Sequence, residues 1–226
     1  MATSDEMVKK GKNGELKCKH DLVIATSDER SVISKTLIMT DKEKVLLYRT
    51  LLNSTVYFEY GCGGSTKFAC EAVPSLEIHS VDSSSKWIEI VENSTCIREG
   101  VEKKRVHMSW INIGKTKRLG YPANEAKKHK WPVYSESVKS VGKRADFVLV
   151  DGRFRVASCL KSLLYTDPVK AKIAVHDFFR RKDYYDVLKY ADIIDCQDNL
   201  VILRAKADLN RGALERDIMK HLHNPA

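Results

Sequence analysis

The sequence predicts an α/β fold in which helices cover both faces of a mostly parallel, seven-stranded sheet, with one antiparallel strand added at an edge by a C-terminal hairpin. Short apolar segments typical of strands alternate with amphipathic segments typical of helices between residues 56 and 191. Only Asp198-Asn199 separates the last two strand segments, which is a hairpin signal. Strand–helix alternation implies parallel pairing through right-handed crossovers, hence a doubly wound sheet.

The sequence divides into an N-terminal arm and a single domain that follows it. Residues 1–35 are polar without a sustained period, and we expect them to form a flexible arm. Residues 36–226 then form a single domain, since a chain of 226 residues suits one core of ordinary size. Its first helix is expected at 41–52, because Thr40 and Glu43 have the spacing of a capping box.

The remaining elements follow in alternation. Proline at position 74 ends the first crossover helix, and a basic insert separates the third strand from the fourth. Strands are expected at 56–60, 76–81, 105–113, 145–150, 171–175, 193–197 and 200–205. Helices are expected at 65–73, 84–96, 156–164, 182–191 and 209–221.

Composition excludes several classes of protein. Apolar residues make up 43% and charged residues 31%, which excludes a disordered chain. No window approaches the ~18 consecutive apolar residues of a spanning helix, so we expect no membrane partner. The six cysteines include no C-x-x-C pair, and the first 20 residues have no apolar signal-peptide core. We therefore expect reduced thiols and a cytoplasmic location.

The charge is concentrated in the insert at 114–144. This stretch has nine Lys or Arg against two Glu, a net +7 of the chain's total of +9. A near-neutral body with one basic segment favours a local anionic contact. A solvated loop that only keeps the protein soluble is the alternative.

The run from Glu59 to Thr66, Glu-Tyr-Gly-Cys-Gly-Gly-Ser-Thr, closes the first strand of the sheet and opens the next helix. Glycines there allow a sharp turn and a close approach by a ligand, and the helix N-terminus offers free N–H groups. The dinucleotide pattern G-x-G-x-x-G requires Gly or Ala where Thr66 stands, and it has no use for Glu59. A nicotinamide-dependent oxidoreductase therefore remains the weaker alternative.

This run closely resembles the first motif of class I S-adenosylmethionine-dependent methyltransferases, in a branch with the signature E-Y-G-x-G-G-S-T. The resemblance covers residues 46–205 and implies a Rossmann-like fold with S-adenosylmethionine as cofactor. It implies that Glu59, Gly61 and Gly63 face the amino-acid portion of the cofactor, and that Asp82 binds the ribose hydroxyls. The implied cofactor-binding set is Glu59, Gly61, Cys62, Gly63, Gly64, Ser65, Asp82 and Ser83. Two structural alternatives stay open: Glu59 as a buried carboxylate that caps the turn, and Asp82 as an N-cap for the helix near Ser84.

Acceptor chemistry is expected where the fourth and fifth strands end, at Asp151, His176 and Asp177. Several O-methyltransferases of the resembled fold hold Mg²⁺ between carboxylates there, which implies a metal site at Asp151 and Asp177. The sequence lacks the Asp-Asn or Asp-Asp pair of those enzymes. His176 is the metal-free alternative, as a general base. The structural alternatives are a turn formed by Asp151 with Gly152, and a hydrogen-bonded strand-end histidine.

The sequence thus favours O-methylation of a small-molecule or saccharide-like acceptor. Its anionic group would be bound by Arg153, Lys127, Lys128 and Lys130. RNA or another macromolecule is the second hypothesis for the acceptor. It is disfavoured because the N/D-P-P-Y motif of amino-methylating enzymes is missing after the fourth strand. A cofactor-binding relic without turnover is the third. The sequence makes no prediction of oligomeric state.

Overall fold

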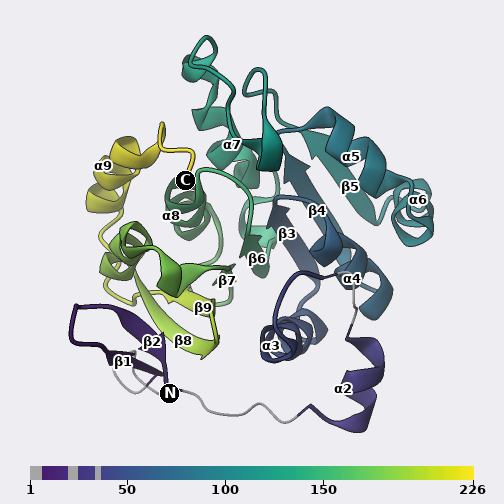
Figure 1. Cartoon of the computed structure of the whole chain (residues 1–226), viewed down its shortest axis with the longest axis horizontal. Coiled ribbons are helices and arrows are strands. Elements are labelled where there is room, and N and C mark those ends of the chain that lie inside the picture. Colours follow the sequence, from purple (N-terminus) through teal and green to yellow (C-terminus); the bar gives the residue numbers. More distant parts are fainter. Residues whose placement is uncertain (1–6, 20–24, 34–36) are drawn as a thin grey trace.

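The computed structural model describes residues 7–19, 25–33 and 37–226. Its centre is a seven-stranded sheet in the order β5-β4-β3-β6-β7-β9-β8, and a two-stranded hairpin forms a separate small sheet beside β8 (Figure 1). The sheet strands are β3 (Val56–Tyr60), β4 (Glu77–Asp82), β5 (Val106–Trp110), β6 (Phe147–Val150), β7 (Lys172–Val175), β8 (Ala191–Gln197) and β9 (Leu200–Ala205). The hairpin consists of β1 (Val8–Lys10) and β2 (Leu16–Cys18).

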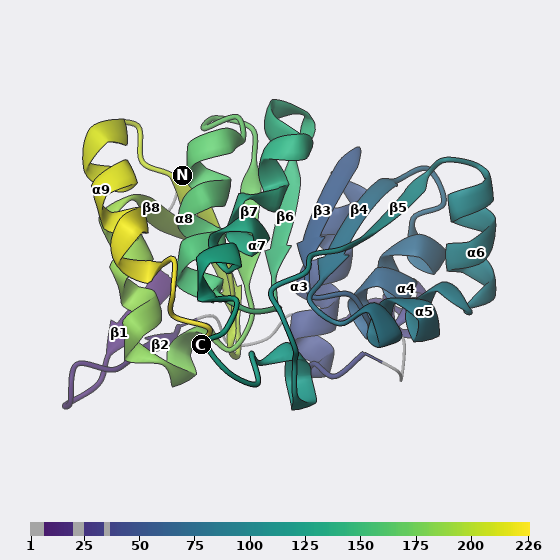
Figure 2. The ribbon, with the colours of Figure 1, turned by 90° about the horizontal axis from the view of Figure 1, so that it is seen from above.

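Helices form a layer on each face of the sheet (Figure 2). One layer packs in a core with α3 (Asp41–Leu52), α4 (Gly64–Ala72), α5 (Ser85–Glu92) and α6 (Thr95–Glu102). The other packs with α7 (Pro132–Glu136), α8 (Arg155–Tyr165) and α9 (Arg211–His221). Strand β6 is buried along its whole length and sends alternate side chains into the two cores. The predicted doubly wound α/β fold is confirmed.

Helix α3 shows why the local predictions succeeded. The Thr40 hydroxyl accepts a hydrogen bond from the Glu43 amide at 3.3 Å, and the Glu43 carboxylate accepts one from the Thr40 amide at 2.8 Å. This reciprocal capping box starts the helix at the predicted residue, and its bounds are those expected from the sequence.

Three predictions about the elements were wrong. The single helix expected at 84–96 is two helices, because Ser94 bonds back to the Val91 carbonyl and then precedes α6. The segment 182–191 forms the 3₁₀ helix η6 (Lys182–Lys189). The antiparallel strand was expected at the sheet edge, but β9 pairs with both β7 and β8 and leaves β8 at the edge.

The N-terminal arm is more ordered than predicted. Residues 7–18 form the β1–β2 hairpin, and a disulfide between Cys18 and Cys196 joins it to β8. Helix α2 (Ser27–Val32) follows, and Arg49 of α3 pairs with its Glu29 at 2.6 Å. The expectation of a flexible arm is therefore wrong for these segments. Residues 1–6, 20–24 and 34–36 lie outside the described residues.

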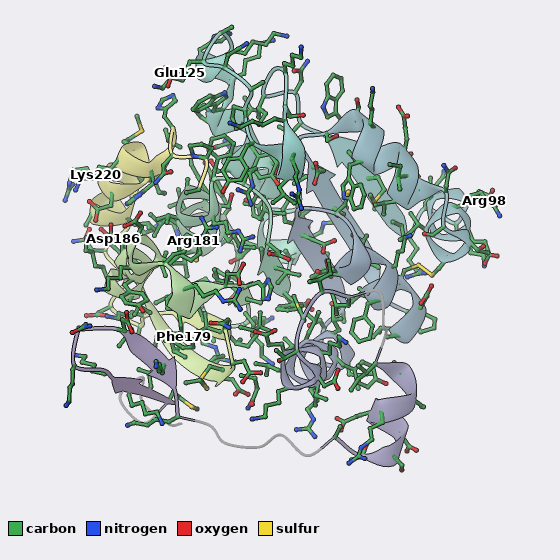
Figure 3. All side chains as sticks on the ribbon, in the orientation of Figure 1. Arg98, Glu125, Phe179, Arg181, Asp186 and Lys220 are labelled. Carbon is green, nitrogen blue, oxygen red and sulfur yellow. A yellow bond between two sulfur atoms is a disulfide. The ribbon has the colours of Figure 1, made fainter. Side chains whose placement is uncertain are left out.

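The expectation of reduced thiols is also wrong for four of the six cysteines. A second disulfide, between Cys70 and Cys96, joins α4 to α6 and is visible in Figure 3. The paired cysteines are 178 and 26 residues apart, so inspection of local spacing misses both pairs. Cys62 and Cys159 are free and buried. The cytoplasmic location was inferred from reduced thiols, and these two disulfides remove the support for that inference.

The basic insert combines a loop with part of the core. Its irregular helices are η1 (Arg118–Gly120), η2 (Lys128–Lys130), α7, η3 (Ser137–Ser140) and η4 (Gly142–Arg144). Trp131, Tyr134 and Val138 are buried in the same core as α8. The second half of the insert therefore packs on the sheet, which the charge pattern did not predict. Among the described residues, no helix is long and apolar enough to cross a bilayer.

Candidate functional site

The carboxyl ends of β3, β4, β6 and β7 lie at one edge of the sheet, where the order of the parallel strands reverses between β3 and β6. In Figure 1 the arrowheads of β3 and β4 point toward the insert. The fold thus brings together the loops 61–65, 82–84, 151–155 and 176–177.

Glu59 lies beneath the glycine loop. Its side chain is fully buried and accepts hydrogen bonds from the hydroxyls of Ser65, Thr66 (2.5 Å) and Ser80 (2.9 Å). Burial raises the pKa of Glu59 to about 7 against the opposing effect of these hydroxyl donors. The geometry therefore matches the turn-capping alternative. Glu59 shapes the loop from below, and the prediction that it faces a ligand does not fit this burial.

Only glycine fits at positions 61 and 152, because the two backbones pack directly against each other. Gly61 has φ +91°, and a Cβ on it would lie 2.7 Å from the Gly152 Cα. A Cβ on Gly152 would lie 2.8 Å from the Gly61 nitrogen and would overlap the Tyr134 hydroxyl. The loops after β3 and β6 therefore touch backbone to backbone.

The rest of the loop is held from its outer side. The Trp87 indole donates to the Cys62 carbonyl at 2.6 Å, and the Gly63 amide donates to the Thr66 hydroxyl at 2.8 Å. Gly64 is the first residue of α4. Burial raises the pKa of the Cys62 thiol well above its ordinary value, so this thiol stays protonated. Cys62 thus contributes its backbone to the loop, and its thiol has no chemical role here.

Asp82 ends β4 beside this loop and is partly exposed. Burial raises its pKa to about 6, although amide donors oppose the shift. One of those donors is the Ser84 amide, at 2.8 Å from Oδ1. Asp82 therefore fixes the turn into α5 and still presents a carboxylate at the predicted cofactor position. The next residue, Ser83, is buried and donates to the Gly120 carbonyl at 3.1 Å, which joins the insert to the site.

Beyond Gly120, the insert contacts the loop after β6. The guanidinium of Arg153 stacks on the Tyr121 ring at 4.0 Å. Arg153 is 6% exposed, and its Nε is a buried donor without a partner in the described part of the chain. Burial would raise the pKa of the Tyr121 hydroxyl, but the neighbouring Arg181 and Arg153 side chains outweigh it and lower that pKa. Three groups that favour anions thus converge where the insert meets the site.

Arg155 lies between the two carboxylates of the predicted magnesium site. Its guanidinium is 2.8 Å from Asp151 Oδ1 and 3.8 Å from Asp177 Oδ2. The buried Arg155 guanidinium thus occupies the space between the two carboxylates, and Arg180 also pairs with Asp177 at 3.2 Å, so both acids already have cationic partners. The residues present do not fit the Mg²⁺ hypothesis.

His176 is held between two carboxylates, with Nδ1 3.2 Å from Asp151 and Nε2 3.6 Å from Glu43. Burial alone would lower the pKa of His176, but the bonds to Asp151 and Glu43 outweigh it and raise the pKa to about 10. The imidazolium therefore keeps its proton at neutral pH. The prediction of a general base does not fit, because that role requires a neutral ring.

The three lysines predicted to bind substrate lie farther out. Lys128 pairs with Glu125 at 3.1 Å and lies over the Trp131 ring at 5.8 Å. Figure 3 shows Glu125 at the outer tip of the insert. Lys127 and Lys130 are exposed on the same segment. The insert thus presents a basic outer tip and a separate inner contact at Arg153.

Sequence reasoning missed two residues of the site. Glu43 was recognised only as a capping residue, yet it also forms an ion pair with His176 and accepts a hydrogen bond from the Asn199 amide at 2.9 Å. Arg155 is not among the site residues predicted from the sequence, yet it is 5% exposed and pairs with Asp151. A usable signal for Arg155 was its place four residues after Asp151, at the start of an apolar helix.

Comparison with known proteins identifies the fold. No family profile and no curated sequence matches the chain. A crystal structure of a methyltransferase-like protein from Silicibacter pomeroyi superposes with TM-score 0.70 at 24% identity, covering 84% of this chain and 97% of the other. A candidate caffeoyl-CoA O-methyltransferase from Staphylococcus aureus superposes with TM-score 0.50 at 10% identity, covering 80% and 93%. The chain therefore has the Rossmann-like fold of class I methyltransferases.

Proposed function

We propose that the protein is an S-adenosylmethionine-dependent methyltransferase. The observation that carries this proposal is the glycine loop of residues 61–64 beside the Asp82 carboxylate, at the carboxyl ends of adjacent strands. The likeness of the fold to the two methyltransferase structures supports it. The ribose hydroxyls would bind Asp82, since one carboxylate accepts two hydrogen bonds. The amino-acid portion would lie against the backbone of the loop.

We further propose that the acceptor is a small molecule with a hydroxyl group and an anionic group. Arg153 supports this, because it is a buried cation whose Nε has no hydrogen-bond partner among the residues that the structure describes. Tyr121 and Arg181 add donors in the same region. An anionic group held by Arg153 would fix the acceptor in line with the sulfonium methyl, and alignment supplies much of the rate in such a transfer.

The acceptor proton would pass to Asp177. His176 is already protonated, and Asp151 Oδ1 is engaged by both His176 and Arg155. Asp177 follows β7 with a left-handed backbone (φ +59°). It is engaged more weakly than Asp151, because its partner at 3.2 Å is the exposed Arg180 and Arg155 lies 3.8 Å away. Asp177→Asn should lower kcat and leave cofactor affinity unchanged, whereas a merely structural Asp177 would tolerate the amide.

Methyl transfer from labelled S-adenosylmethionine to fractionated cell extract tests the proposed function. Label in the small-molecule pool supports the proposal, and label in the RNA pool would replace the acceptor class with a macromolecule. Glycan and protein pools are counted separately. A protein that binds the cofactor and labels no pool would be an inactive relic, contrary to the proposal.

A further inference from the structure

Three side chains of types that can ligate metals meet at the end of the sheet opposite the candidate site. Glu77 is the first residue of β4 and His79 the third, so both point to the same side of the strand. His107 lies on the edge strand β5, directly opposite His79 in the parallel register. The fold itself therefore brings the three together.

Their geometry is that of an incomplete coordination shell. One ligand atom from each residue lies within 4.8 Å of the others. The two imidazole rings stack at 4.4 Å between centroids with 15° between planes. His79 Nε2 and Glu77 Oε1 are 2.6 Å apart, so a hydrogen bond joins them. A divalent cation can take the place of the proton in that bond.

The donor set selects the class of metal. Two imidazoles and one carboxylate suit Zn²⁺ and related transition metals, whereas Mg²⁺ and Ca²⁺ prefer all-oxygen sites. Zinc bonds of about 2.0–2.1 Å place tetrahedral ligand atoms roughly 3.4 Å apart, which small side-chain rotations reach from the present positions. Three protein ligands leave a fourth position for water.

The cluster is accessible and contains one competing cation. The His79 and Glu77 side chains are 17% and 33% exposed, and His107 is exposed. The same face of β5 continues through Ser109 into an open groove of about 460 Å³, which gives an ion a path of entry. Arg144 pairs with Glu77 Oε1 at 3.0 Å, but its side chain is 57% exposed and free to move into solvent.

We propose that Glu77, His79 and His107 bind a divalent transition-metal ion of the zinc class, which fastens the edge strand β5 to β4. Without the ion, Arg144 pairs with the Glu77 carboxylate, and this ion pair competes with binding of the metal. This site is separate from the methyltransferase function proposed above, and neither depends on the other.

Calorimetric titration of the full, untagged chain with ZnCl₂ tests the site. The wild type should bind one Zn²⁺ that His107→Gln and Glu77→Gln each weaken at least tenfold. Arg144→Gln should bind more tightly than the wild type, because the competing cation is gone. His129→Gln is the matched control, since His129 is an exposed histidine outside the cluster. Co²⁺ should give visible absorption bands that are lost in His107→Gln.

A melting curve of each variant without metal shows whether it folds, and Zn²⁺ should raise the melting temperature of the wild type but not of His107→Gln. Equal zinc affinity in the wild type and His107→Gln would place the ion elsewhere and overturn the proposal. Weaker binding in Arg144→Gln would overturn it as well. That variant removes only an exposed side chain, so it keeps the test decisive if a ligand variant fails to fold.

Discussion

The Gly61 backbone lies against that of Gly152, at a distance that leaves no space for a side chain on either residue. The contact joins the loop after β3, where we propose that the cofactor binds, to the loop after β6, which leads to Arg153 and Arg155. The two halves of the site are therefore positioned by one backbone contact, and this determines what substitution of either glycine should do.

Gly61→Ala and Gly152→Ala should each destabilise the fold by about 2–4 kcal/mol, because the new Cβ meets backbone atoms that cannot move aside. Gly61→Ala also carries the strain of a left-handed backbone. Urea unfolding gives the free energies, with Gly212→Ala in α9 as the control, since the Cβ there makes ordinary contacts. A loss below ~1 kcal/mol at both sites would show that the loops separate readily.

The clamp of His176 by Asp151 and Glu43 predicts a loss of stability at alkaline pH. The pKa of His176 is raised to about 10 in the folded protein, so its contribution is complete below the unfolded value of ~6.5 and disappears as pH rises through about 10. The stability advantage of the wild type over His176→Gln should shrink by about 2 kcal/mol or more between pH 7 and pH 10. An advantage that does not change over this range would contradict the charged histidine.

The disulfides predict a specific pattern of alkylation. In denaturant without reductant, iodoacetamide should label the two free cysteines, Cys62 and Cys159, and after reduction it should label all six. Reduction should lower the free energy of unfolding by about 3–5 kcal/mol for each loop that is opened. Labelling of six cysteines without reductant would restore the expectation of reduced thiols.

The basic tip of the insert should affect the acceptor more than the cofactor. Reversing Lys127, Lys128 and Lys130 to Glu should raise the acceptor KM and weaken its salt dependence, with cofactor affinity unchanged. If single-stranded RNA were the acceptor, its binding constant would instead fall by ~0.7 log units per log unit of added salt for each phosphate contacted. Unchanged acceptor kinetics in the triple variant would leave the tip as solvated surface. Tyr121→Ala is the comparison for the inner contact with Arg153.

The sequence predicted those parts of the structure that depend on local pattern. The alternation of strands and helices, the Thr40 capping box and the glycine loop could all be read along the chain, and the structure has them. The positions of the two loops after β6 and β7 followed from the rule that parallel strands end at one sheet edge.

The remainder depends on contacts between residues distant in sequence. Nothing near Glu43 indicates that it meets His176, 133 positions later, or that Cys18 reaches Cys196. The roles predicted for His176 and Asp151 differ from what the structure shows for the same reason. A strand-end histidine looks like a base until two carboxylates keep it charged, and a carboxylate pair looks like a metal site until Arg155 lies between them.

Calorimetric titration with S-adenosylhomocysteine, the demethylated product, tests the central claim most directly. We predict one site, weakened at least tenfold in Asp82→Ala, because a lost charged hydrogen bond to the ribose costs about 1.5–3 kcal/mol. Wild-type affinity should also fall below pH ~6, since burial raises the pKa of Asp82 to about 6 and the protonated group loses acceptor capacity. Asp208→Asn, at an exposed carboxylate far along the chain, should bind like the wild type. Tight binding of NADH with no heat from S-adenosylhomocysteine, or equal affinity in Asp82→Ala and the wild type, would contradict the account.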